Sequence, residues 1–272
     1  MIVFLNGKFV SENDAVVGVN DAGFLYGHGV YETLRAFDGK LKFLDEHLDR
    51  LNESAAAFGL EVPYSKNEIK GFLEELVGKN LEERKDLRIR ITLTAGEGSF
   101  YTGESGQPTF LITTRIIYEE NVDPVSVATL EIERTYPQIK STSMISNILA
   151  KNHARSQGAF ESIMIDRRGR ATEGTFTNLF IVKNGVLKTP GQWMLSGITR
   201  KMILELAPEI MPVEECDIFR EELYDADEIL LTNSVKGIVS VREVDGRVVG
   251  DGEMGKFTQR IQKKYLEVLH QL

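Results

Sequence analysis

The chain has 272 residues, 42% of them hydrophobic and 27% charged, which is enough for one large domain or two smaller ones with their own cores. A formal net charge of -9, with no Lys or Arg run longer than a pair, argues against a nucleic-acid partner. One cysteine excludes an internal disulfide, and the lack of a basic leader or a bilayer-length apolar run predicts a cytoplasmic protein that does not enter a membrane.

The first half predicts hairpins and helices in turn. Asn-Gly at 6–7 and Asp-Gly at 38–39 each separate two short strands. Apolar residues spaced by threes and fours predict a helix from Asp45 to a cap at Gly59, with Arg50 beside its apolar stripe, and a second helix covers about 65–79. In the strand LRIRITLT (87–94), Arg88 and Arg90 project from the polar face.

An acidic, proline-containing stretch at 118–124 is predicted to link a domain at 1–117 to a domain at 125–272. The second half predicts strands at 125–134, 161–166, 175–182, 228–234 and 238–244. Helices are expected at 144–157, after Gly197 and from 256 to the end, with a hairpin at 184–185. Many hairpins without a regular strand-helix-strand alternation indicate an α+β fold and disfavour Rossmann and TIM-barrel architectures.

Three features stand out for chemistry, and each also has an ordinary explanation. Lys140, in TYPQIKSTS, lies where a predicted strand gives way to a helix, and a lone lysine is usually a solvated charge. Glu173-Gly174 fits a solvated turn as well as a functional acid. The segment GITR (197–200) fits an ordinary loop-to-helix transition, but backbone N–H groups at a helix start can also hold a phosphate.

Several segments, in this order, resemble the class-IV aminotransferases, the pyridoxal-phosphate enzymes of fold type IV. They run the length of the chain and include NDAGFLYGHGVYETLRAFDGK, FLDEHLDRL, IKSTSMISNILAK, RATEGTFTNLF, LSGITR, YDADEILLTNS and VREVDGRVVGDGEMGKFTQRIQ. The resemblance implies a small α+β N-terminal domain and a larger C-terminal pseudo-barrel domain. It also implies a homodimer in which a loop of one subunit completes the site of the other, and that loop is expected to include His28 or to lie near 95–108.

The resemblance also assigns roles. Lys140 resembles the lysine that forms the Schiff base with pyridoxal 5'-phosphate and then acts as the base, and Glu173 resembles the carboxylate that pairs with the pyridine nitrogen. Arg50 resembles the phosphate-binding arginine. The remaining phosphate contacts match Ile198, Thr199 and Ser234.

Substrate contacts are less sharply defined. Tyr31 matches a tyrosine of the D-amino acid and branched-chain enzymes, and Arg90, Lys236 and His28 are further candidates for holding a substrate carboxylate. The alternative is that Arg90 forms a surface ion pair, that Lys236 is solvated and that His28 only shapes its loop.

Four functions stay open. Ile145 stands where branched-chain enzymes carry tyrosine and TNSVKG replaces their TGTAAE-like loop, which counts against an L-branched-chain aminotransferase. The stretch AGEGS (95–99) lacks the Arg-x-His pair of the D-alanine enzymes. The first expectation is a D-amino acid transaminase with a different carboxylate pocket, using 2-oxoglutarate or pyruvate as acceptor. An aminodeoxychorismate lyase is the next alternative, then a branched-chain enzyme, and a non-catalytic pyridoxal-phosphate binder is the alternative from another class.

Overall fold

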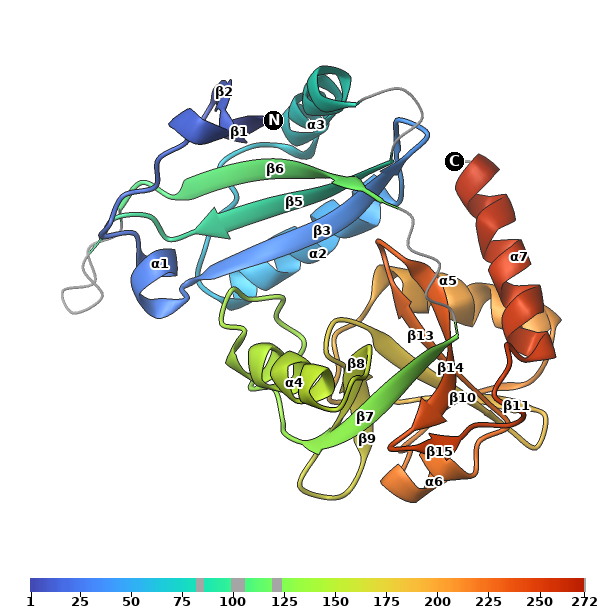
Figure 1. Cartoon of the computed structure of the whole chain (residues 1–272). Helices are drawn as coiled ribbons and strands as arrows, with labels where there is room; N and C mark the ends of the chain where they lie inside the picture. The colour runs from blue at the N-terminus through green and yellow to red at the C-terminus, as the bar shows by residue number, and fades with distance from the viewer. Residues whose placement is uncertain (82–85, 99–105, 119–123, 272) are drawn as a thin grey trace. The chain divides into compact units, whose positions relative to one another are not determined.

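A computed structural model of the chain describes residues 1–81, 86–98, 106–118 and 124–271 (Figure 1). The chain divides into two compact units, one formed by Met1–Glu119 with Ile139–Ser143 and the other by Glu120–Gln138 with Met144–Leu272. Apart from its two end residues, the predicted linker at 118–124 lies outside the described residues. The predicted α+β class is confirmed.

The first unit is an antiparallel sheet of six strands in the order β2-β1-β6-β5-β3-β4 (Figure 1). The strands are β1 (Ile2–Leu5), β2 (Lys8–Ser11), β3 (Gly29–Phe37), β4 (Lys40–Leu41), β5 (Asp86–Thr94) and β6 (Thr109–Ile117). Its helices are α1 (Ala22–Tyr26), α2 (Leu44–Ala57) and α3 (Lys66–Asn80), with a 3-10 turn at Glu12–Asp14.

Local sequence signals explain this unit well. Asn6 and Gly7 both have positive φ, as do Asp38 and Gly39, which is the backbone that two-residue hairpins require. Helices α2 and α3 bury their apolar stripes in one core with the sheet, α2 against β3 and α3 against β1 and β6. The two predicted hairpins and both predicted helices are confirmed.

The second unit is a mixed sheet in the order β12-β11-β10-β13-β14-β7-β8-β9, with β15 paired to β14. The pairs β11 with β12, β14 with β7 and β7 with β8 are parallel and the others antiparallel. Strand β9 also contacts β10, so the sheet curls back on itself around a core of aliphatic side chains, and the predicted pseudo-barrel is confirmed.

The strands of the second unit are β7 (Val125–Glu131), β8 (Glu161–Ile165), β9 (Ala171–Gly174), β10 (Asn178–Lys183), β11 (Val186–Thr189), β12 (Val213–Glu215), β13 (Glu228–Asn233), β14 (Gly237–Val244) and β15 (Arg247–Val248). Its helices are α4 (Ile145–Ser156), α5 (Ile198–Leu206), α6 (Arg220–Tyr224) and α7 (Lys256–Gln271), with a 3-10 turn at Ala207–Glu209. Helix α4 packs on β7 and β8, while α5 and α7 pack on each other and on β13 (Figure 1).

Two predicted strands differ from the structure. The strand expected at 125–134 ends at Glu131, and the strand expected at 175–182 begins only at Asn178. Residues 175–177 form a turn between β9 and β10, because Thr177 Oγ1 donates to Glu161 Oε2 (2.8 Å) and Asn147 Nδ2 donates to the Thr175 carbonyl (2.6 Å). Both partners come from distant parts of the chain, which local alternation cannot reveal.

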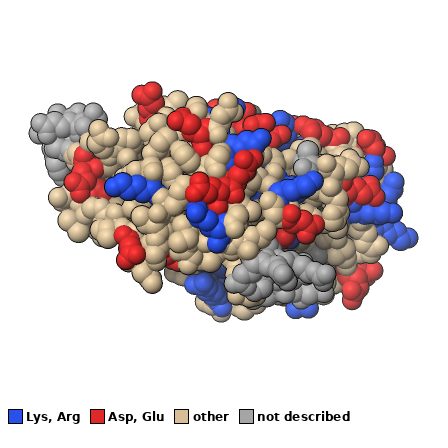
Figure 2. Space-filling view, turned by 90° about the horizontal axis from the view of Figure 1, so that it is seen from above, with Lys and Arg blue, Asp and Glu red and all other residues tan. Residues whose placement is uncertain are grey.

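None of the helices in the described part of the chain is long and apolar enough to cross a membrane. On the face shown in Figure 2, basic and acidic side chains are interspersed rather than gathered in areas of one sign.

Candidate active site

Lys140 is fixed by its backbone in the first unit. Its carbonyl accepts the Tyr31 N–H (2.9 Å), and its own N–H donates to Ser54 Oγ on α2 (3.3 Å). Ser141 forms a bridge to Val30, so the segment lies alongside the start of β3. The amine Nζ lies 4.7 Å from the centroid of the Tyr31 ring. The structure therefore brings together Lys140 and Tyr31, which were predicted separately.

Arg90 contacts the same ring. Its Cζ lies 3.7 Å from the Tyr31 centroid, and its Nε donates to Thr92 Oγ1 (3.1 Å). Burial lowers the pKa of Arg90 and the Tyr31 hydroxyl partly offsets this, but a guanidinium stays charged at neutral pH. Within the described ranges, no carboxylate pairs with Arg90, whereas Arg35 on the neighbouring strand pairs with Asp86. A half-buried cation in this position suits a substrate carboxylate.

Arg50 belongs to a buried triad between β3 and α2. Its Nε and Nη2 donate to the two oxygens of Glu32 at 2.7 Å each, and His47 Nδ1 lies 2.8 Å from Glu32 Oε2. All three residues are buried. Glu32 therefore orients the guanidinium of Arg50 in a bidentate pair.

The charges of the triad follow from its surroundings. Burial alone would raise the pKa of Glu32, but Arg50 and His47 together hold it well below its usual range. Burial lowers the pKa of His47 despite the opposing effect of Glu32. His47 is therefore neutral and donates its Nδ1–H to the carboxylate, which leaves Nε2 as a buried acceptor without a partner among the described residues.

Sequence reasoning did not identify Glu32 or His47, although a signal was present. Glu32 lies between Val30 and Leu34 on the apolar face of β3, where a charge needs a partner. His28 is placed differently from the other predicted substrate contacts. Its Nε2 lies 3.1 Å from the Phe58 carbonyl, and its ring packs edge-on against the Phe58 ring.

Glu173 lies at the end of β9 in the second unit and is 4% exposed. Its Oε1 accepts from Arg134 Nη1 (2.8 Å) and its Oε2 from the Leu195 N–H (3.1 Å). A Cβ on Gly174 would approach Thr177 Oγ1 to 2.1 Å, so the glycine after the acid is required by packing. Arg134 was also not identified from the sequence.

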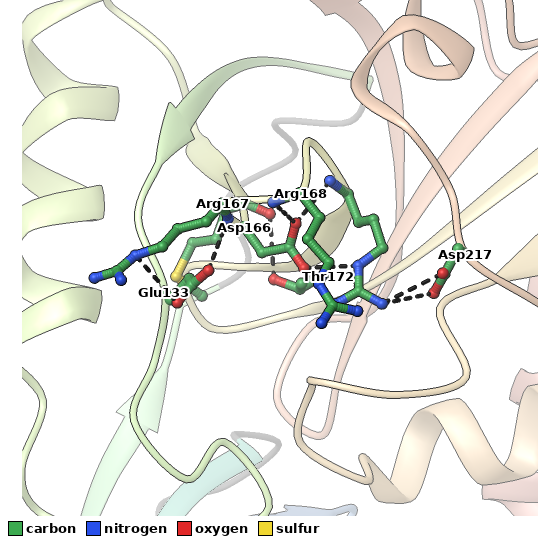
Figure 3. Close-up of polar contacts among 8 residues, drawn as sticks. Glu133, Asp166, Arg167, Arg168, Thr172 and Asp217 are labelled. Carbon is green, nitrogen blue, oxygen red and sulfur yellow. Dashed lines mark hydrogen bonds and ion pairs between the residues drawn. The ribbon is translucent and has the colours of Figure 1, made fainter.

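The hairpin that leads into Glu173 is held at its tip by a polar network (Figure 3). Asp166 accepts the Arg168 N–H (2.9 Å) and the Arg170 Nε–H (2.7 Å), and Arg170 Nη1 also donates to Asp217 Oδ1 (3.2 Å). Burial opposes the charge of Asp166, but these hydrogen bonds and the Arg170 guanidinium lower its pKa. The turn between β8 and β9 is therefore fixed by side chains, which holds the strand that carries Glu173.

The start of α5 is a candidate phosphate-binding site. Gly197 caps this nine-residue helix without a side-chain hydrogen bond, and Ile198 and Thr199 form its buried first turn. A helix N-terminus offers backbone N–H groups and a favourable dipole to an anion. Thr232 lies on β13, against which α5 packs, and its buried Oγ1 has no partner in the part of the chain that the structure describes, so this unit can accept a polar ligand.

Ser234 and Lys236 lie in the turn that follows β13. Asn233 Oδ1 accepts the backbone N–H groups of Val235 (3.0 Å) and Lys236 (2.8 Å), which shapes this turn. The Lys236 amine lies 5.8 Å from the centroid of the Phe160 ring, against which Lys151 also packs.

The predicted site residues thus fall into two sets, one in each unit. The first unit holds Lys140, Tyr31, Arg90, His28 and Arg50, and the second holds Glu173, Ile198, Thr199, Ser234 and Lys236. Within the second unit, a buried carboxylate and the N–H groups at the start of α5 suit the ring nitrogen and the phosphate of pyridoxal phosphate, so the residues of that unit fit this cofactor.

The model of the family described as amino-transferase class IV matches residues 29–244, so the chain belongs to the class IV aminotransferases. It is 40% identical to a putative branched-chain-amino-acid aminotransferase of Methanocaldococcus jannaschii, with 98% of this chain and 96% of that protein covered. It is 33% identical to the D-alanine aminotransferase of Bacillus licheniformis, with 96% and 95% covered.

Solved structures agree with this family. The branched-chain aminotransferase from Thermoproteus uzoniensis with norvaline has a TM-score of 0.91 and 32% identity, with 98% of this chain and 94% of that chain covered. A further branched-chain amino acid aminotransferase, solved with pyridoxamine 5'-phosphate, has a TM-score of 0.91 and 26% identity, with 98% and 93% covered. These similarities confirm the predicted fold.

Proposed function

We propose that the protein is a pyridoxal-phosphate-dependent transaminase that moves an amino group from a D-amino acid, such as D-alanine or D-glutamate, to a 2-oxo acid, such as 2-oxoglutarate or pyruvate. One observation carries the assignment of an α-amino acid substrate: the Lys140 amine and the Arg90 guanidinium both contact the Tyr31 ring. A reactive amine and a carboxylate anchor so close together suit an α-amino acid, whose carboxylate is one bond from the reacting carbon.

Five residues would hold the cofactor besides Lys140. Glu173 would pair with the ring nitrogen, Arg50 would contact the phosphate, and Ile198, Thr199 and Ser234 would complete the phosphate cradle. When bound, pyridoxal phosphate supplies an electron sink for the negative charge that forms at the substrate α-carbon. The similar branched-chain enzyme that was solved with pyridoxamine 5'-phosphate supports this assignment.

Each residue then has a defined task. Arg90 and the Tyr31 hydroxyl orient the substrate carboxylate, with Lys236 as a further cation and His28 as a shaper of the loop. Lys140 would hold the cofactor covalently, and its amine would act as the base that takes the proton from the substrate α-carbon. Arg134 and the Leu195 N–H both donate to the Glu173 carboxylate and hold it in place, and its negative charge would keep the ring nitrogen protonated.

The D-amino acid donor rests on departures from the branched-chain motifs and on D-alanine relatives. Ile145 and the loop TNSVKG replace branched-chain features, and D-alanine aminotransferases match nearly the whole chain at about one-third identity. A second candidate, an L-branched-chain aminotransferase, is favoured by the 40% identical relative and by the Thermoproteus uzoniensis structure.

Half-reaction spectra test the proposal. The purified protein, loaded with pyridoxal phosphate, is mixed with D-alanine, D-glutamate, L-leucine or L-glutamate, and the visible band is followed. Bleaching by the D-substrates alone is the expected result. Bleaching by L-leucine alone contradicts the D-donor and supports the second candidate. If none of the four amino acids bleaches the band, transamination is contradicted and the aminodeoxychorismate lyase alternative is favoured. If the protein takes up no cofactor, the enzyme assignment itself is contradicted.

A cytoplasmic homodimer is part of the same proposal. Ile145, Ile148 and Leu149 form an exposed apolar stripe on α4, and Phe24, Leu25 and Tyr26 are exposed on α1. Exposed apolar stripes of this kind are typical of subunit interfaces. Light scattering is expected to give twice the mass of the chain, and Ile148→Glu is expected to shift the protein toward monomer.

A further inference from the structure

The segment Leu195–Gly197 joins two functional ends of the second unit. Its first residue donates its N–H to Glu173 Oε2 (3.1 Å), and its last residue is the N-cap of α5. Three residues therefore connect Glu173, the proposed partner of the cofactor ring, to the start of α5, the proposed phosphate site.

The side chain of Asn178 contacts this segment. It lies at the start of β10, is 5% exposed, and its Nδ2 donates to the Leu195 carbonyl (2.7 Å). Its Oδ1 lies only 1.9 Å from the position that a Cβ on Gly197 would take. One side chain thus contacts both ends of the segment.

The backbone of Gly197 does not itself require glycine. Its φ of -71° and ψ of 140° are open to any residue, and the next nearest side chain, Arg200, lies at ordinary contact distance from the added Cβ. The position is closed to a side chain because Asn178 occupies the space.

We propose that Asn178 is a positioning residue that couples the two ends of the cofactor cradle, fixing the Leu195 N–H on Glu173 and the first turn of α5 at the same time. The inference rests on the proposed function, since it assumes that pyridoxal phosphate binds here. Without the Asn178 side chain, the Leu195 carbonyl loses its donor, the segment shifts, and both the ring contact and the phosphate contact weaken.

Ligand affinities of the apo-protein test the coupling at each end. Inorganic phosphate probes the start of α5, pyridoxal probes the ring end, and pyridoxal phosphate probes both. Asn178→Ala is expected to weaken binding of all three by about tenfold, the effect of leaving one buried polar group unpaired. Asn178→Ser shortens the side chain so that its donor no longer reaches Leu195 and adds no charge, so it gives the same test if the alanine variant does not fold.

Thr189→Val is the matched control. Thr189 is also buried in this unit and donates to a backbone carbonyl at 2.7 Å, but that carbonyl belongs to Leu179 and not to the segment Leu195–Gly197. It is expected to lower the melting temperature without changing any of the three affinities. If Asn178→Ala does the same, Asn178 is only structural and the proposal is overturned. A loss confined to phosphate or to pyridoxal also overturns it, because the two ends are then not coupled.

A double-mutant cycle tests whether the Asn178 side chain is what excludes a larger residue at position 197. Gly197→Ala is expected to weaken phosphate binding in the parent protein and to have little further effect in the Asn178→Ala background, where the space is open. An equal effect in both backgrounds contradicts the role of Asn178. If the parent protein itself binds neither pyridoxal phosphate nor phosphate, the proposed function fails, and that result differs from every outcome above.

Discussion

The guanidinium of Arg90 stacks on the ring of Tyr31, with 3.7 Å between Cζ and the ring centroid. The two residues lie on neighbouring strands, where Tyr31 pairs with Thr92 and Thr33 pairs with Arg90, so the contact is diagonal across the sheet. The same ring lies 4.7 Å from the Lys140 amine. Tyr31 therefore sets the position of the proposed carboxylate anchor, Arg90, relative to the proposed reactive amine of Lys140.

Replacing Arg90 by glutamine tests the anchor. Removing one charge-assisted contact to the substrate is expected to lower kcat/KM by about 10- to 100-fold, mainly through KM, while pyridoxal-phosphate affinity stays unchanged. Arg88→Gln is the control, because Arg88 lies two residues away on the same face of β5 and is exposed. Equal kinetics in the two variants would remove Arg90 from the substrate site.

Replacing Glu32 by glutamine tests the buried triad. The change leaves the buried Arg50 without its carboxylate and is expected to cost about 3 kcal/mol of unfolding free energy. It is also expected to weaken inorganic phosphate binding, because Arg50 loses its orientation. Glu12→Gln, which breaks the exposed pair with Arg115, is expected to cost under about 1 kcal/mol. Similar denaturant midpoints for the two variants would contradict the account of the triad.

The lowered pKa of His47 predicts how the free energy of unfolding depends on pH. Its pKa in the folded protein lies below the usual histidine value because it is buried, so the unfolded chain binds a proton more readily as the pH falls. The stability contributed by neutral His47 is complete above the usual value of about 6.5 and declines as the pH falls below it. Glu32 contributes in the same direction at lower pH, because its pKa is held well below its usual range.

Denaturant unfolding between pH 7.5 and 5 checks this expectation. The parent protein is expected to lose stability steadily below about pH 6.5, and His47→Gln is expected to show a flatter profile over the same range. Parallel profiles would mean that another group carries the acid sensitivity.

Glu173→Gln tests the proposed pairing of Glu173 with the cofactor ring nitrogen. Losing its negative charge is expected to slow transamination on the order of 100-fold, because the ring nitrogen is no longer kept protonated. Glu228→Gln is the control, since Glu228 accepts the N–H groups of Phe257 and Thr258 at the start of α7 and serves a structural purpose. A Glu173→Gln protein with the parent rate and an unchanged cofactor spectrum would exclude this role.

Local patterns predicted much of the fold. The Asn-Gly and Asp-Gly turns, the apolar spacing of α2 and the alternation of β5 depend on neighbouring residues only, and each is confirmed. The turn at 175–177 was missed because Glu161 and Asn147 shape it from elsewhere in the chain.

The candidate site was predictable only in part, because some of its contacts also join residues from distant parts of the chain. Resemblance pointed to Lys140, Glu173 and Arg50, but residues that act by orienting these three carry no motif of their own. The partnership of Arg50 with Glu32 and His47, and that of Glu173 with Arg134, depends on which side chains the fold buries together.

The most direct test of the central claim is the Lys140→Ala variant, measured by its visible spectrum with pyridoxal phosphate and by its rate with the best amino donor. Lys188→Ala, which removes a lysine that pairs with Glu222, is the control and is expected to match the parent. The account predicts that Lys140→Ala lacks the parent band and transaminates at least about 1000-fold more slowly, since it has lost both the covalent attachment and the base. A Lys140→Ala protein with the parent spectrum and the parent rate would contradict the account.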